Sequence, residues 1–188
     1  MQKKVLSEIA LYYGDVAMPK GFEIDRKRLQ SDILKSNMFN RELSYSRAWD
    51  MLNTYIREHI KVEYDIALIN KESWGNIYKP KEISIPLLNI NPVDLRNSPD
   101  YTMLYGVTVK NCSVRIHYDS NRRAGRSWDI PLVNNRFIMF PSTCMYYLLY
   151  CKMLESTSVQ ASCCVFLTTV DLLIHLQHHQ RLTFYHYP

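Results

Sequence analysis

The chain has 188 residues, a length that suits one domain with a sizeable hydrophobic core. Its formal net charge of +5 is mild and its Lys and Arg residues are scattered, so the composition argues against a nucleic-acid partner. Five irregularly spaced cysteines argue against a disulfide framework, and the late apolar run from Cys163 to Leu176 is interrupted by Asp171 and is too short for a membrane span. Because Lys3, Lys4 and Glu8 interrupt the apolar start, we expect no signal peptide and a cytoplasmic location.

The first sixty residues are predicted to be helical. Asp25 can cap a helix that continues to about Ser36, and Ser44 can cap a second one. In the second segment the apolar residues recur at steps of three and four, which places them on one face. These residues are Tyr45, Ala48, Trp49, Leu52, Tyr55 and Ile56. We therefore expect two helices that each bury one face.

Over residues 62–68 the apolar residues alternate with others, which is typical of a strand, and further short segments of this kind follow. Seven strands are predicted, over residues 62–68, 73–78, 83–88, 101–109, 112–118, 127–132 and 136–140. Turn-forming segments separate several of them, notably residues 89–99 and 119–125. Seven strands after two helices predict a mainly β (α+β) fold, a β-sandwich or jelly roll with the two N-terminal helices packed on one sheet.

The last part of the chain has a different composition. Four of the five cysteines lie between residues 144 and 164, and four of the six histidines lie between residues 175 and 186. We therefore divide a single domain, 1–188, into a helical part (1–60), a β core (61–150) and an atypical C-terminal segment (151–188). That segment is either a separate element or a tail that is not native to the fold, and its apolar run suits a strand or a buried helix equally well.

Several blocks of the sequence resemble the iron(II)/2-oxoglutarate oxygenase superfamily. Residues 72–78, Glu-Ser-Trp-Gly-Asn-Ile-Tyr, and residues 98–107 resemble its opening strands, while residues 119–122 and 140–142 resemble its later ones. The resemblance covers residues 60 to 150 and is greatest to oxygenase-like proteins of marine bacteria and their phages. It implies a double-stranded β-helix, and a phage-encoded protein would lie in the host cytoplasm or the virion.

That family implies an iron centre built from two histidines and one carboxylate, with a basic residue that pairs with 2-oxoglutarate. In one register, the resemblance places the first histidine and the carboxylate within residues 83–94, and the distal histidine a few residues after Phe-Pro-Ser (140–142). Residues 83–94 contain no histidine. This segment offers Asn89 and Asn91 instead, and Tyr146 stands near the position of the distal histidine. These residues cannot replace imidazole ligands with comparable affinity. In this register the metal-binding motif is degenerate.

A second register starts from the His-x-Asp sequence at His117 and Asp119. His175 follows as a candidate distal ligand, and Arg181 as a candidate anchor for 2-oxoglutarate. In this register His117, Asp119 and His175 would bind Fe(II). The alternative is a surface histidine on an amphipathic strand, followed by an aspartate that begins a turn.

Two functional classes therefore stay open. The first is an Fe(II)/2-oxoglutarate-dependent dioxygenase that hydroxylates a protein or small-molecule substrate, with no catalytic residue assigned beyond the metal and cosubstrate ligands. The second is a catalytically silent, non-enzymatic binding or assembly protein of phage or marine metagenomic origin, which could form a homo-oligomer. The 14 tyrosines suit the contact surfaces that the second class needs.

Overall fold

A computed structural model describes residues 9–16, 25–39, 47–78, 84–110, 112–119, 125–150 and 163–172. Within these ranges the chain forms two helices, a short 3₁₀ turn (Leu95–Asn97) and eight strands. The helices are α1 (Arg26–Phe39) and α2 (Arg47–Tyr64). The strands are β1 (Tyr12–Asp15), β2 (Leu68–Tyr78), β3 (Tyr101–Thr108), β4 (Cys112–Asp119), β5 (Gly125–Leu132), β6 (Arg136–Pro141), β7 (Met145–Tyr150) and β8 (Cys163–Leu172).

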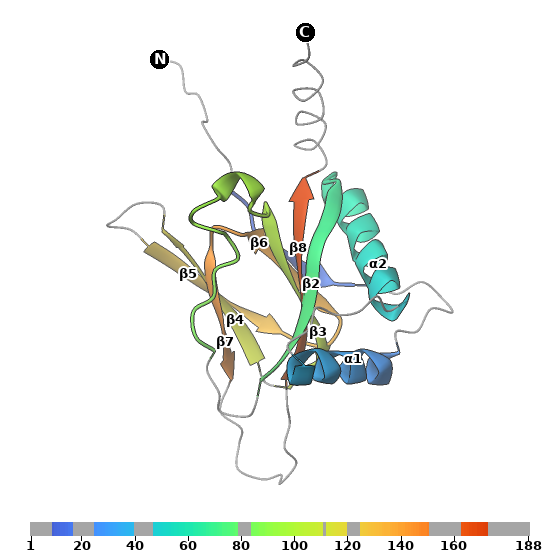
Figure 1. Cartoon of the computed structure of the whole chain (residues 1–188). Coiled ribbons are helices and arrows are strands. Elements are labelled where there is room, and N and C mark those ends of the chain that lie inside the picture. Colours follow the sequence, from blue (N-terminus) through green and yellow to red (C-terminus); the bar gives the residue numbers. More distant parts are fainter. Residues whose placement is uncertain are drawn as a thin grey trace, which may run out of the picture.

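The strands form two antiparallel sheets, as Figure 1 shows. One has five strands in the order β1-β6-β3-β8-β2, and the other has three in the order β5-β4-β7. Both helices pack on the five-stranded sheet, on the face turned away from the three-stranded sheet (Figure 1). The mainly β prediction is confirmed, and the arrangement is consistent with a jelly roll. Neither described helix is both long and apolar enough to cross a membrane.

Helix α1 begins where the sequence predicts. The Asp25 carboxylate accepts a hydrogen bond of 2.9 Å from the Arg28 amide, which caps the first turn. Leu29 and Ile33 are fully buried against the sheet. At Gly75 of β2, a Cβ atom would lie 2.4 Å from Cγ1 of Ile33, so the absence of a side chain there permits the close approach of helix and strand.

The prediction of a strand over residues 62–68 is wrong in its first half. Helix α2 continues to Tyr64, and Asp65 follows with a positive φ of 54°, a common way to end a helix. Ile56 and Ile60 are fully buried one turn apart, so packing on the sheet extends the helix through residues whose alternation suggests a strand. Ser44, the predicted cap of this helix, lies outside the described residues.

The five-stranded sheet separates two hydrophobic cores. On the helix side, residues such as Met103, Phe137 and Val170 pack against α1 and α2. On the other face, residues such as Leu104 and Phe140 pack against the three-stranded sheet. The space between the sheets is therefore the interior of the jelly roll, and inward-facing side chains there can form a site.

The β core extends beyond the predicted limits of 61–150. Strand β1 lies in the part predicted to be helical, and it pairs with β6. Residues 163–172 of the atypical C-terminal segment form β8, which pairs with both β2 and β3. The sequence left β8 undecided because a strand buried on both faces has a continuous apolar pattern.

The predicted strand 83–88 is reduced, within described residues 84–88, to one bridge between Leu87 and Tyr146 of β7. Pro86 cannot donate to a sheet ladder, which limits the pairing of this segment. The backbone nevertheless follows β7, since Leu87 and Tyr146 exchange hydrogen bonds of 2.8 and 3.0 Å. The segment therefore enters the interior directly after Leu87.

Candidate functional site

Four polar side chains meet inside the jelly roll. The Asn89 amide donates hydrogen bonds of 3.1 Å to Thr102 Oγ1 and 3.2 Å to Tyr146 Oη. The hydroxyls of Thr102 and Ser142 lie 2.9 Å apart and share a further hydrogen bond. Thr102, Ser142 and Tyr146 are almost completely buried. We refer to Asn89, Thr102, Ser142 and Tyr146 as the Asn89 cluster.

The Phe-Pro-Ser sequence positions half of this cluster. The chain turns sharply after β6, with a 2.9 Å hydrogen bond from the Cys144 amide to the Pro141 carbonyl. The Ser142 amide donates to the Asp100 carbonyl at 3.0 Å, which fixes this turn beside β3. Strand β7 then begins at Met145, so Tyr146 enters the interior opposite Asn89.

The cluster lies where the first sequence register expects metal ligands. Two ligands that each lie roughly 2.1 Å from one metal must have donor atoms within about 4.2 Å of each other. Asn89 Nδ2 and Tyr146 Oη are 3.2 Å apart and meet this condition. The structure therefore brings together the two chain segments to which the resemblance assigns ligands.

The chemistry of these donors does not fit Fe(II). Burial raises the pKa of the Tyr146 phenol well above its usual range, against the opposing effect of the Asn89 hydrogen bond, so the phenol stays neutral. The Asn91 amide oxygen accepts a 3.0 Å hydrogen bond from the Val93 amide in an exposed turn. Within the described ranges, no group of three His, Cys, Asp or Glu residues could hold a metal ion. The Asn89 cluster therefore lacks the imidazole and carboxylate donors that an iron centre requires.

A cavity of about 410 Å³ borders Asn89 and Asn91 and reaches Trp74 and Thr169. Of the residues lining it that the structure describes, Lys71 is the only cation. Its ammonium group donates to the Asn97 carbonyl and lies 3.6 Å from the Asp171 carboxylate. Lys71 is thus already paired, and β8 contributes no basic side chain to bind the distal carboxylate of 2-oxoglutarate.

The second register falls on a different surface. His117 and Asp119 do meet, with Nε2 and Oδ1 3.0 Å apart. They alternate along β4 with Val114 and Ile116, which point into the interior core, so the pair lies on the outer face of the three-stranded sheet. His175 and Arg181 lie outside the described residues. The triad of His117, Asp119 and His175, with Arg181 as anchor, stays a prediction.

Sequence reasoning missed Thr102 and Ser142. Both are fully buried, and each hydroxyl has a partner within the Asn89 cluster. The available signal was a threonine at an inward position of β3, whose neighbouring inward residue, Leu104, is apolar. A buried hydroxyl needs a partner, so such a position indicates a polar contact across the interior.

No protein-family model and no curated protein matches the chain. Solved structures do. A Pseudomonas putida prolyl-4-hydroxylase aligns with a TM-score of 0.57 and 11% identity over 87% of this chain and 89% of that one. AviO1 from Streptomyces viridochromogenes aligns with a TM-score of 0.56 and 8% identity, over 87% of this chain and 90% of its own.

HygX from Streptomyces hygroscopicus, in a structure with nickel and 2-oxoglutarate bound, aligns with a TM-score of 0.53 and 6% identity over 87% of this chain and 83% of its own. At such identities the similarity shows the fold alone. The chain has the fold of these three structures.

Proposed function

We propose that this chain is a double-stranded β-helix protein of the 2-oxoglutarate oxygenase type that binds a partner or ligand and does not oxidise it. The observation that supports this most directly is the contact between Asn89 and Tyr146. A neutral amide and a neutral phenol occupy the place where that fold would bring metal ligands together. The partner would be a protein, a small molecule or a second copy of the chain.

The hydrogen bonds of the Asn89 cluster also give a structural reason for an amide and a phenol at the positions where metal ligands are expected. A buried polar side chain without a partner costs about 1–3 kcal/mol, so an interior that has no metal needs another way to satisfy its polar groups. The hydroxyls of Thr102 and Ser142 and the amide of Asn89 satisfy one another. The cluster thus holds β3, β7 and the segment after Leu87 together without an ion.

Anaerobic calorimetry with Fe(II), and with Mn(II) as a redox-stable substitute, tests this proposal. At pH 7 we expect no stoichiometric binding and no formation of succinate from 2-oxoglutarate. Stoichiometric binding that persists in a His117→Ala variant, but is lost when Asn89 and Tyr146 are both replaced by alanine, would overturn the proposal. Light scattering of the purified protein separates self-association from a monomer that needs another partner.

A second candidate is an Fe(II)/2-oxoglutarate-dependent dioxygenase that uses the second register. The observation in its favour is the 3.0 Å contact between His117 and Asp119. His117, Asp119 and His175 would hold Fe(II), which supplies the oxidising chemistry when bound, and Arg181 would hold 2-oxoglutarate. This candidate requires stoichiometric Fe(II) binding that His117→Ala and His175→Ala each abolish. His178→Ala, in the same histidine-rich part of the chain, is the matched control and should retain binding.

A further inference from the structure

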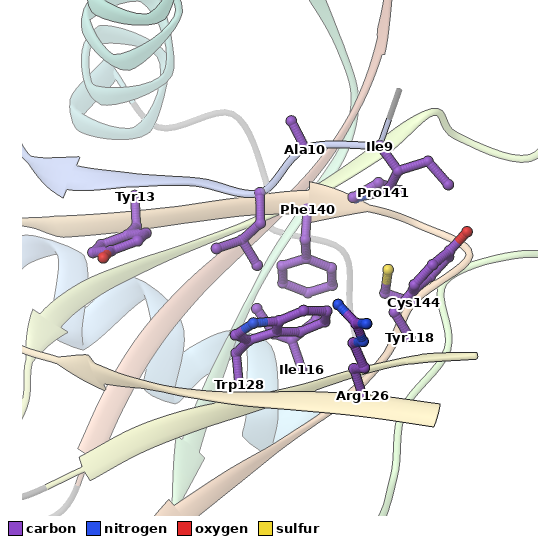
Figure 2. Close-up of a pocket in the computed structure, with 11 residues that line it drawn as sticks. Ile9, Ala10, Tyr13, Ile116, Tyr118, Arg126, Trp128, Phe140, Pro141 and Cys144 are labelled. Carbon is purple, nitrogen blue, oxygen red and sulfur yellow. The ribbon is translucent and has the colours of Figure 1, made fainter. Parts of the chain in front are cut away.

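A second, larger cavity lies between the two sheets, beside the edge formed by β1. Its volume is about 680 Å³, which is within the usual range for sites that bind small molecules. Figure 2 shows the side chains that line it, which come from β1 and the residues before it, from β4, β5 and β6, and from the turn at Cys144. Most of them are apolar or aromatic.

The wall formed by β5 shows that the interior is open at this end. Every second residue of β5 points into the interior. The exposed fraction of these inward side chains rises along the strand from Leu132 (1%) and Ile130 (5%) to Trp128 (45%). Arg126 is the next inward-pointing residue of β5 and is exposed as well. Trp128 and Arg126 therefore remain exposed, although their strand positions, opposite Ile116 and Tyr118 of β4, point into the interior.

Among the described residues that line this cavity, Arg126 is the only charged one. Figure 2 shows its guanidinium group directed from β5 towards Phe140, next to the Trp128 ring. Its side chain forms no hydrogen bond or ion pair with any residue that the structure describes. The nearest acidic residue along the β4 partner strand, Asp119, is engaged with His117 on the outer face.

A guanidinium with no partner among the described residues, on an apolar wall, favours an anionic ligand with an apolar body. The anion would receive charge-assisted hydrogen bonds from Arg126, and the body would cover the exposed Trp128 ring. We propose that this cavity binds a small organic anion, namely a carboxylate attached to an aliphatic or aromatic group. This inference goes beyond the proposed function, because it concerns a separate cavity and does not depend on whether the chain binds metal.

Three probes with the same chain length separate charge from hydrophobicity: octanoate, octanol and octylammonium. Calorimetry with the full chain should show octanoate binding at least roughly tenfold more tightly than octanol, as expected for a charged hydrogen bond, with octylammonium the weakest. The Arg126→Gln variant should bind octanoate no better than octanol. Arg115→Gln is the matched control, because Arg115 pairs with Asp129 on the outer face of the same sheet and should not affect the preference.

A second measurement locates the ligand. Cys144 lines the cavity, so bound octanoate should slow the alkylation of Cys144, measured by peptide mass spectrometry. Each of three results would overturn the proposal. They are equal affinity for octanoate and octanol, a preference for octanoate that is retained in Arg126→Gln, and octanoate binding that does not protect Cys144. The absence of binding by all three probes would overturn it too, because it would mean that other residues of the chain or a partner fill the cavity.

Discussion

Asn89 and Tyr146 are 57 positions apart in the sequence, yet the Asn89 amide donates a 3.2 Å hydrogen bond to the Tyr146 phenol inside the jelly roll. The segment after Leu87 and the start of β7 are held at this separation by the backbone hydrogen bonds between Leu87 and Tyr146. The side chains of Asn89 and Tyr146 are therefore close enough to bind one metal ion, but their donor atoms are unsuited to iron.

Replacing these donors should create a metal site. The triple variant Asn89→His, Asn91→Asp and Tyr146→His supplies two imidazoles and one carboxylate at the positions named by the first register. We expect it to bind Co(II) with visible absorption bands and a stoichiometry near one, while the wild-type protein shows neither. These would be measured by absorption titration and calorimetry.

The control for that experiment is the variant with Asn89→His and Tyr146→His alone, which lacks the carboxylate and should bind Co(II) more weakly. A triple variant that folds, by circular dichroism, but binds no Co(II) would show that the backbone does not present these positions to a common ion.

Removing the Tyr146 hydroxyl should destabilise the fold. Tyr146→Phe deprives the partly buried Asn89 amide of one partner, so we expect the free energy of unfolding to fall by about 1–2 kcal/mol. Urea denaturation monitored by fluorescence measures this change. Tyr147→Phe is the matched control: its hydroxyl makes only a 3.5 Å contact with Arg115 on the outer face, and its loss should have little effect. Equal effects of the two substitutions would contradict a structural role for the Asn89 cluster.

The contact between α1 and β2 depends on the lack of a side chain at Gly75. Gly75→Ala places a methyl group 2.4 Å from Cγ1 of Ile33, so overpacking should lower the free energy of unfolding by about 1–3 kcal/mol. A double-mutant cycle with Ile33→Ala should be non-additive, because the smaller residue makes room for the new methyl group.

Gly14→Ala serves as the control, since a Cβ there meets Phe137 at 3.4 Å, an ordinary contact distance. Strictly additive effects of Gly75→Ala and Ile33→Ala would show that the two residues are not in contact.

The reactivity of Cys144 should report its burial. Desolvation raises the pKa of this thiol to about 11, and only the thiolate reacts with iodoacetamide. At pH 8 the thiolate is therefore about one part in a thousand, and the alkylation rate should rise about tenfold per pH unit until the pH approaches that pKa.

Unfolding in urea returns the pKa towards its ordinary value of 9.0 and should speed alkylation at pH 8 about a hundredfold. Peptide mass spectrometry separates Cys144 from the other cysteines. A native rate at pH 8 equal to that of the unfolded chain would contradict the buried position.

Much of the fold could be predicted from local patterns. The Asp25 cap, the alternation along β4 and the short apolar runs of β3 and β6 are local features, and the structure has them close to the expected positions. The first half of the 62–68 segment was misread because its alternation suits either a strand or the exposed end of a helix. Only the burial of Ile56 and Ile60 against the sheet decides in favour of the helix.

The candidate site was predictable only in part. The resemblance indicated the segments that contain Asn89 and Tyr146, since both positions follow from their spacing to recognisable blocks. The participation of Thr102 and Ser142 could not be predicted, because it depends on how β3 and the turn after β6 pack across the interior. The positions of His117 and Asp119 relative to His175 stay a prediction for the same reason: sequence spacing does not say which face of a sheet two strands share.

The position of β8 has a consequence for biosynthesis. Strands β2 and β3 are made before β8, and they do not pair with each other in the five-stranded sheet, because residues 163–172 lie between them. Until residues 163–172 have been added, the edges of β2 and β3 that will pair with β8 have no hydrogen-bonding partner. Such unpaired edges promote aggregation. A chain that stops short of residue 163 should therefore accumulate in inclusion bodies, and the newly made protein can complete its five-stranded sheet only after residues 163–172 have been synthesised.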